Sequence, residues 1–177
     1  MHRVIASVSK RSIINRMVGA ALLEPEQYQE AALAPSVKTQ AILVVIVSSI
    51  AVGLGSLGAG LVGFVLGAIA GLASWGVYAF AAYRVAIARF QVPPSVTIWG
   101  STWRVLALAS TPRIFLVFTL VPGIGLLVGL AVHAWLLITT VSALRPALDL
   151  DTRPTIIVAL SGWLPMFLLW VLVWLLV

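Results

Sequence analysis

His133 is the residue of this sequence whose type and position most suggest chemistry. It lies in the apolar run "GLAVHAWLLITT", and the other histidine of the chain is His2. A neutral imidazole inside a membrane could bind the metal of a tetrapyrrole as an axial ligand. His2 lies outside the apolar segments, so His133 could hold only a single-ligand pigment or complete a site shared with another subunit. The preferred interpretation is a structural histidine, hydrogen-bonded to Ser, Thr or backbone on a neighbouring helix.

The carboxylates of the chain all lie outside its long apolar segments. They are Glu24, Glu26, Glu30, Asp149 and Asp151. The pair in "DLD" could bind a cation, but Arg145 and Arg153 flank it, so a solvated loop is preferred. No metalloprotease, nucleophile-elbow or phosphate-loop motif occurs in the sequence. We therefore expect neither an enzyme nor a metal site. We also expect no pump, because proton-coupled transport usually depends on carboxylates within the membrane.

The composition indicates that most of this chain is embedded in lipid. Of its 177 residues, 62% are hydrophobic and 9% are charged, whereas a soluble domain has about 25% charged residues. Such a chain predicts an all-α, polytopic bundle of transmembrane helices. The absence of cysteine excludes disulfides and thiolate chemistry. The net charge of +6 indicates membrane topology and anionic lipid rather than nucleic acid.

About five spans fit the apolar segments. They are expected near residues 39–57, 60–83, 104–121, 124–144 and 155–177. The third is the least regular, because it contains Pro112 and Arg113. Either Arg113 faces protein, or the true span is shorter and kinked.

Residues 1–35 are expected to lie at the cytoplasmic face, before a transmembrane domain of residues 36–177. A basic amphipathic helix over residues 2–23 that lies on the membrane surface is preferred over a poorly ordered tail. Its apolar face comprises Ile14, Val18, Ala21 and Leu22. Glu24-Pro25-Glu26 interrupts it and starts a short acidic helix. The glutamates of that helix are expected to pair with arginines of the same chain between residues 84 and 104, or with a basic partner.

The distribution of Lys and Arg predicts the orientation. Basic residues occupy the N-terminal segment, a loop over residues 84–104 and a loop over residues 145–153, while "GLGSLGAG" and "VPGIG" have none. Five spans place all basic loops on one side, so the N-terminus is predicted to be cytoplasmic and the C-terminus outside a plasma membrane. The residues expected to face the cytoplasm and anionic lipid are Lys10, Arg11, Arg16, Arg84, Arg89 and Arg104.

Two sets of residues are candidates for packing against helices or partners. Gly63, Gly67 and Gly71 are four residues apart, a pattern that lets a neighbouring helix approach closely. Packing within the chain is preferred over a homodimer. The second set is an aromatic stripe on the last span, for which a lipid-facing position is slightly preferred over a partner. It comprises Trp163, Phe167, Trp170 and Trp174.

The order of these parts resembles the Yip family of five-span membrane proteins, in its prokaryotic branch. The resemblance rests on the helix "LLEPEQYQE" before the first span, the segment "TWRVLALASTPRIFLVFTLVPGIG", and the polar "RPALDLDTRP" before the last span. It covers most of the chain from about Val18. It implies a fold with no catalytic residues. Eukaryotic members are linked to Rab-type GTPases, but this chain lacks their long cytosolic N-terminal region, so a GTPase partner is not expected.

The sequence therefore predicts a non-catalytic integral membrane protein that acts as an accessory or scaffold subunit. It would pack against membrane lipids and other membrane protein subunits, without nucleic acid and without a predicted cofactor. One alternative is a pigment-binding subunit of an electron-transfer or light-harvesting complex that uses His133. Another is a small channel or lipid-handling protein.

Overall fold

The computed structural model describes residues 12–93 and 96–176. All regular secondary structure in this part of the chain is helical. Four helical stretches are long and apolar enough to cross a membrane: Pro35–Gly55, Leu57–Phe90, Ile98–Leu120 and Gly125–Leu148. The prediction of an all-α fold is thereby confirmed, and these four stretches have the length and composition of membrane spans.

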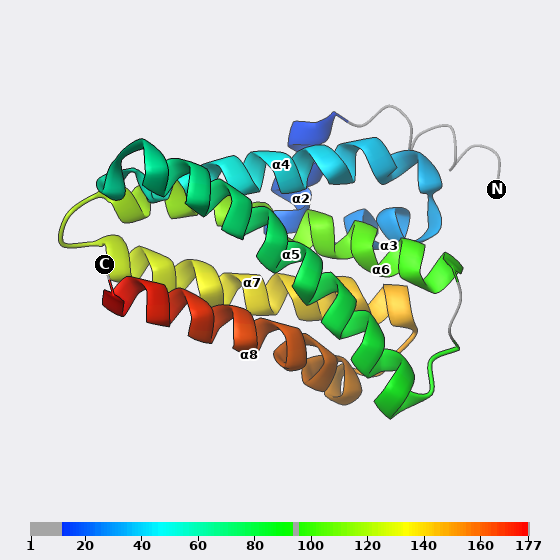
Figure 1. Cartoon of the computed structure of the whole chain (residues 1–177). Helices are drawn as coiled ribbons and strands as arrows, with labels where there is room; N and C mark the ends of the chain where they lie inside the picture. The colour runs from blue at the N-terminus through cyan, green and yellow to red at the C-terminus, as the bar shows by residue number, and fades with distance from the viewer. Residues whose placement is uncertain (1–11, 94–95, 177) are drawn as a thin grey trace.

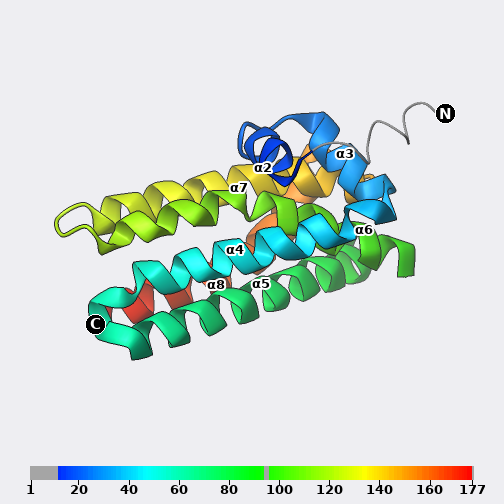
Figure 2. The same cartoon turned by 90° about the horizontal axis from the view of Figure 1, so that it is seen from above.

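The helices run largely along one common direction, with chain reversals at both ends (Figure 1). In chain order they are α2 (Ile13–Ala21), α3 (Pro25–Leu33), the 3₁₀ turn η1 (Pro35–Val37), α4 (Lys38–Gly55), the 3₁₀ turn η2 (Leu57–Ala59), α5 (Gly60–Phe90), α6 (Val96–Ala109), the 3₁₀ helix η3 (Thr111–Leu120), α7 (Gly125–Leu148) and α8 (Thr152–Leu176). The short helix α2 runs across the bundle instead of along it (Figures 1 and 2).

Local sequence explains where the N-terminal helices begin. The Ser12 side chain accepts a hydrogen bond from the Asn15 amide and caps α2. Pro25 occupies the first turn of α3, followed by Glu26, as predicted from the sequence. The sequence predicts the amphipathic helix over residues 2–23. The structure has the helix α2 over Ile13–Ala21 within this range, and residues 1–11 lie outside the described part.

The basic loop predicted over residues 84–104 is wrong. Helix α5 continues to Phe90, and α6 begins at Val96, so the connection is much shorter. Arg84, Arg89 and Arg104 all lie on helices. The helix continues past the apolar segment because an arginine near a helix end can extend its charged group towards the interface. It ends where Gln91 adopts a left-handed backbone, just before Pro93-Pro94.

The third span changes helix type in its middle. Helix α6 ends at Ala109, and the chain continues as the 3₁₀ helix η3 after Ser110. Pro112 has no amide hydrogen, so a regular α-helix through this point would lose a hydrogen bond. This span also lies at the centre of the bundle. In its apolar 18-residue stretch, 61% of the residues are buried, compared with 11% in the corresponding stretch of the span that contains α5.

The buried core lies where α3, α5, α6 and α7 meet. It includes Tyr28, Ala82, Leu106, Leu108 and Leu144, each largely or fully buried. Helix α8 lies beside both α5 and α7 and closes this side of the bundle (Figure 1). Many large apolar side chains on the outer faces stay exposed, as in a protein that is surrounded by lipid.

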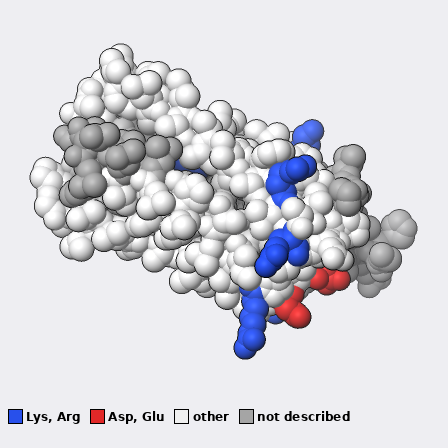
Figure 3. All heavy atoms as spheres, turned by 60° about the horizontal axis from the view of Figure 1, so that its bottom comes forward, with Lys and Arg blue, Asp and Glu red and all other residues white. Residues whose placement is uncertain are grey.

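Charged side chains gather at one end of the bundle, while most of the remaining surface in this view carries none (Figure 3). The charged end includes the first residue of α4, the last turns of α5 and the connection between α7 and α8. Its exposed residues include Lys38, Arg84, Arg89, Arg145, Asp149, Asp151 and Arg153. The turns at the other end, around η2 and after η3, have no charged residue.

Candidate functional site

The glycine ridge packs inside the chain. A Cβ atom on Gly67 would lie 2.6 Å from Ser56 Oγ and 3.1 Å from Gly53 Cα, and one on Gly71 would lie 3.2 Å from Ser49 Cα. A Cβ on Gly63 would likewise collide with the Ser56 carbonyl oxygen. The ridge therefore lets α4 and α5 approach closely, in agreement with the preferred prediction. It is not open to a second copy of the chain.

The aromatic stripe on α8 faces α7, at least in its first half. Trp163 and Phe167 stack with their ring centroids 4.7 Å apart, and Trp163 Nε1 donates to the His133 carbonyl oxygen at 2.9 Å. The lipid-facing position preferred from the sequence is wrong for these two, because the indole N–H finds its acceptor on the neighbouring helix. The side chains of Trp170 and Trp174 lie outside the described residues.

His133 is buried in α7, with 3% of its surface exposed. Its Nδ1 lies 2.8 Å from the Gly129 carbonyl oxygen of the same helix, and its ring meets the edge of Phe167 at a centroid distance of 5.4 Å. The Phe167 ring and the Gly129 carbonyl oxygen therefore both contact this imidazole inside the chain. Among the described residues no cluster of His, Asp and Glu could hold a metal ion.

The six basic residues assigned to the lipid-facing cytoplasmic surface divide into three kinds. Arg84 and Arg89 are exposed at the charged end, as predicted. Arg16 and Arg104 are 1% and 8% exposed, so their predicted surface position is wrong. Lys10 and Arg11 lie outside the described residues. The two buried arginines are drawn inward by acceptors on α3.

Arg104 caps the C-terminal end of α3. Its Nε donates to the Ala31 carbonyl oxygen at 2.8 Å, and its Nη2 donates to the Ala32 carbonyl oxygen at 2.9 Å. The last carbonyls of a helix have no partner within it and carry the negative end of the helix dipole. The guanidinium of α6 therefore satisfies both the hydrogen bonds and the charge of this helix end.

Arg16 ties α2 to α3 through an ion pair. Its Nη1 lies 2.8 Å from Glu30 Oε2, and the side chains are 1% and 15% exposed. Glu24 Oε2 accepts instead from the Gln27 side chain. Glu30 therefore pairs with an arginine of α2, not with one between residues 84 and 104 as expected.

The end of α2 is held by two aromatic side chains. Tyr28 Oη donates to the Ala20 carbonyl oxygen at 2.6 Å, and Trp135 Nε1 of α7 donates to the Ala21 carbonyl oxygen at 2.9 Å. Burial raises the pKa of Tyr28 well above its ordinary value. The opposite face of α2 stays exposed, with Ile14, Val18 and Leu22 between 52% and 67% accessible.

Arg113 faces protein, which resolves the alternative left open by the sequence. It is 5% exposed, and its Nη2 donates to the Gly71 carbonyl oxygen at 2.9 Å and to Ser74 Oγ at 3.2 Å. Thr139 Oγ1 makes a similar link, because it donates to the Ala109 carbonyl oxygen just before the change of helix type. Polar side chains inside the span thus tie neighbouring helices together.

A shallow groove opens at the charged end between α3 and the α7–α8 connection. Its volume is about 640 Å³, and its lining includes Gln29, Arg145, Asp149 and Asp151. Asp149 adopts a left-handed backbone at the end of α7. Because cationic and anionic side chains mix here, the groove presents no single charge to a ligand.

Sequence reasoning missed the residues that link the helices. Trp135 lies in an apolar run that predicts only a membrane span, and neither Thr139 nor Ser74 stands out in its segment. Trp135 and Thr139 donate to backbone carbonyls of other helices, and Ser74 accepts from Arg113; no sequence motif marks these partners. The available signal was general: an indole or hydroxyl in a lipid-embedded segment needs an acceptor.

Comparison with known proteins gives no relative from which a function could be transferred. No protein-family model matches the sequence, and neither a curated protein nor a solved structure matches it. A function for this chain must therefore be inferred from its own geometry.

Proposed function

We propose that this chain is a non-catalytic scaffold subunit of the membrane, which packs against other membrane components. The observation that carries the proposal is the use of its polar groups inside the bundle. Arg104, Arg113, Trp135 and Trp163 each donate to a backbone carbonyl of a neighbouring helix. Such bonds hold helices in a fixed arrangement. These interhelical hydrogen bonds support the role of a rigid scaffold.

The outer face of α5 is the surface we propose for the partner. Only 11% of the residues in the apolar 18-residue stretch of this span are buried. Its exposed side chains include Leu61, Val62, Val65, Leu66, Ile69 and Leu72. The glycine ridge and the described part of the α8 aromatic stripe are used within the chain, so a partner helix would bind here instead.

Extraction in a mild detergent tests this proposal. The tagged full-length chain should leave its native membrane in a particle larger than the chain alone, with defined companions. Truncating Leu66 and Ile69 together to alanine should remove a companion without lowering the melting temperature, since both are about 60% exposed. The matched control truncates Leu127 and Ile138 of α7, which are 66% and 52% exposed. A particle that contains only this chain would contradict the proposal.

We further propose that the chain has five spans, with α8 as the fifth. The membrane would be the plasma membrane, and the charged end of the bundle would face the cytoplasm. The gathering of Lys and Arg at one end supports this orientation. On the same grounds, α2 would lie at the interface with its exposed apolar face in lipid. The resemblance to the Yip family is consistent with this topology and stays a prediction.

Single cysteines can test the orientation, because the chain has none of its own. Gly58 lies in the uncharged η2 turn, where a Cβ would meet nothing within 4 Å, and Ser36 is exposed at the charged end. A membrane-impermeant maleimide should label Gly58→Cys on intact cells and Ser36→Cys only after permeabilisation. The reverse pattern would contradict the orientation.

The pigment alternative stays a prediction that the same preparation tests. A visible absorption band that is lost in His133→Ala would support it. A colourless preparation would remove it.

A further inference from the structure

Arg113 is a cation placed deep inside the bundle. Its Nη2 binds the Gly71 carbonyl oxygen, and the helix from Gly71 to the charged end at Phe90 is about 28 Å long. An arginine at such a depth costs at least about 2.5–3.5 kcal/mol on insertion scales. The residues around it should therefore show how that cost is offset.

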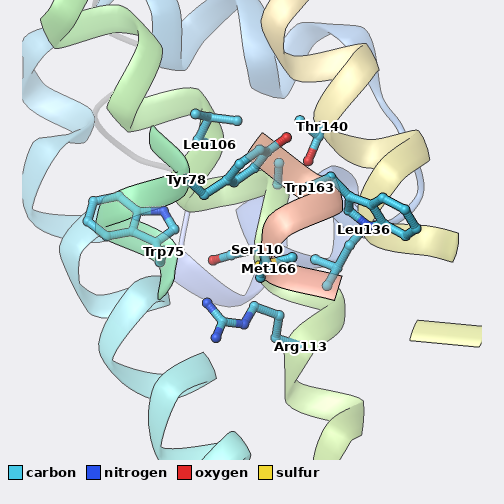
Figure 4. A pocket seen from close by; sticks show the side chains of 10 residues that line it. Trp75, Tyr78, Leu106, Ser110, Arg113, Leu136, Thr140, Trp163 and Met166 are labelled. Carbon is cyan, nitrogen blue, oxygen red and sulfur yellow. The ribbon is translucent and has the colours of Figure 1, made fainter. Parts of the chain in front are cut away.

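A small cavity adjoins this arginine. Its volume is about 10 Å³, and its lining includes Trp75, Ser110, Arg113, Thr140 and Trp163. Figure 4 shows the indole nitrogen of Trp75, the hydroxyl of Ser110 and the guanidinium of Arg113 turned towards the same region. A volume near 10 Å³ accommodates about one water-sized sphere.

Two hydrogen-bond donors converge on this cavity. The Trp75 Nε1–H is buried and has no acceptor among the described protein atoms. The guanidinium of Arg113 carries five N–H donors, and its two hydrogen bonds to Gly71 and Ser74 both come from Nη2, so they use only some of these donors. Ser110 Oγ donates to the Ala107 carbonyl oxygen, so its single proton is already used and the donors at the cavity are Trp75 and Arg113. The donor set matches a ligand that accepts hydrogen bonds.

The charge of Arg113 has no carboxylate beside it. The acids of the chain are Glu24, Glu26, Glu30, Asp149 and Asp151. None of them lines the cavity, and Glu30 pairs with Arg16. Carbonyl and hydroxyl dipoles solvate a cation but do not neutralise it, and buried charges in proteins are generally paired.

We propose that Arg113, with the N–H of Trp75, binds a halide ion inside the bundle. The geometry favours a monatomic anion, because phosphate and sulfate far exceed the cavity, whereas chloride is only somewhat larger than a water molecule and needs a small outward shift of the lining side chains. A chloride ion would accept the indole N–H and the free guanidinium donors and would neutralise the buried cation. It would thereby join η3 to α5. This inference is independent of the proposed scaffold role.

The test uses the purified full-length protein in a chloride-free gluconate buffer at constant ionic strength. Replacing gluconate by chloride should raise the melting temperature by about 3–6 °C for each tenfold increase above the dissociation constant. Bromide should act in the same way and also quench part of the tryptophan fluorescence saturably, since the ion would touch Trp75. Sulfate should not reproduce either effect.

Trp75→Phe is the deciding variant, because it keeps an aromatic ring and removes only the N–H donor and part of the indole. It should weaken the chloride response at least several-fold and remove the saturable quenching. Arg113→Gln should abolish both if the variant folds. Trp99→Phe is the matched control: Trp99 packs against Tyr83 at a centroid distance of 5.2 Å, it does not line the cavity, and the variant should respond like the wild type.

Equal melting temperatures in chloride and gluconate would overturn the proposal, and the cavity would then hold at most water. A chloride response that persists unchanged in Trp75→Phe would also overturn it, because the ion would then bind elsewhere.

Discussion

Two helix pairs in this molecule are held together by different means. The α4–α5 hairpin, towards the uncharged end, is closed by small residues, with Gly67 and Gly71 against Gly53 and Ser49. The α2–α3 pair, towards the charged end, is held by an ion pair and by side chains that bind helix-end carbonyls. Where helices run through lipid, close backbone contact replaces the hydrophobic effect. Where helices end, the unpaired carbonyls require donors.

Gly67→Leu should break the hairpin and have the largest effect. Its Cβ would lie 2.6 Å from Ser56 Oγ and 3.1 Å from Gly53 Cα, and the rest of the leucine side chain would need still more room, so we expect a loss of about 3 kcal/mol. Gly76→Leu is the control on the same helix, because a Cβ there meets nothing within 4 Å. Thermal unfolding in detergent measures both. Similar melting temperatures for the two variants would contradict the role of the ridge.

Arg104→Met should release the helix pair and leave the hairpin intact. Two bonds from a charged donor to the Ala31 and Ala32 carbonyls would be lost, at a cost of about 3 kcal/mol. The expected result is proteolysis between α2 and α4 at a protease concentration that the wild type resists. Arg89→Met, at an exposed position, should change little. Equal protection of both variants would show that the pair is held mainly by its apolar contacts.

The smallest expected effect is the dependence of the melting temperature on high pH, which tests Tyr28 in the α2–α3 pair. Burial raises the pKa of Tyr28 above its ordinary value of 10.0. The folded state therefore keeps its proton longer than the unfolded state, so this contribution is complete below pH 10 and is lost as the pH rises above it. The melting temperature should fall more steeply above pH 10 in the wild type than in Tyr28→Phe. Parallel curves would count against a buried phenol at this site.

The sequence was informative about the character of each segment and less so about its surroundings. Apolar length, prolines and the distribution of charge predicted the helical fold, the start of α3 and the basic end. The same reasoning placed Arg16 and Arg104 at the surface, because an arginine is usually solvated. What reversed their position was the end of α3, which accepts from Arg104, and Glu30, which pairs with Arg16; both meet the arginines only after folding. The inward turn of Trp163 depends likewise on the His133 carbonyl, which has no sequence signal.

The hydrogen bond between Trp135 and Ala21 has a consequence for biosynthesis. The two residues are 114 positions apart in the chain, so the carbonyl is made well before its donor. At about 5–20 residues per second, the interval is on the order of ten seconds. During that time α2 cannot reach its final site, although its exposed apolar face can already rest on the membrane. The helix made earliest among those described is therefore among the last to dock, because it can bind its site only after α7 has been made.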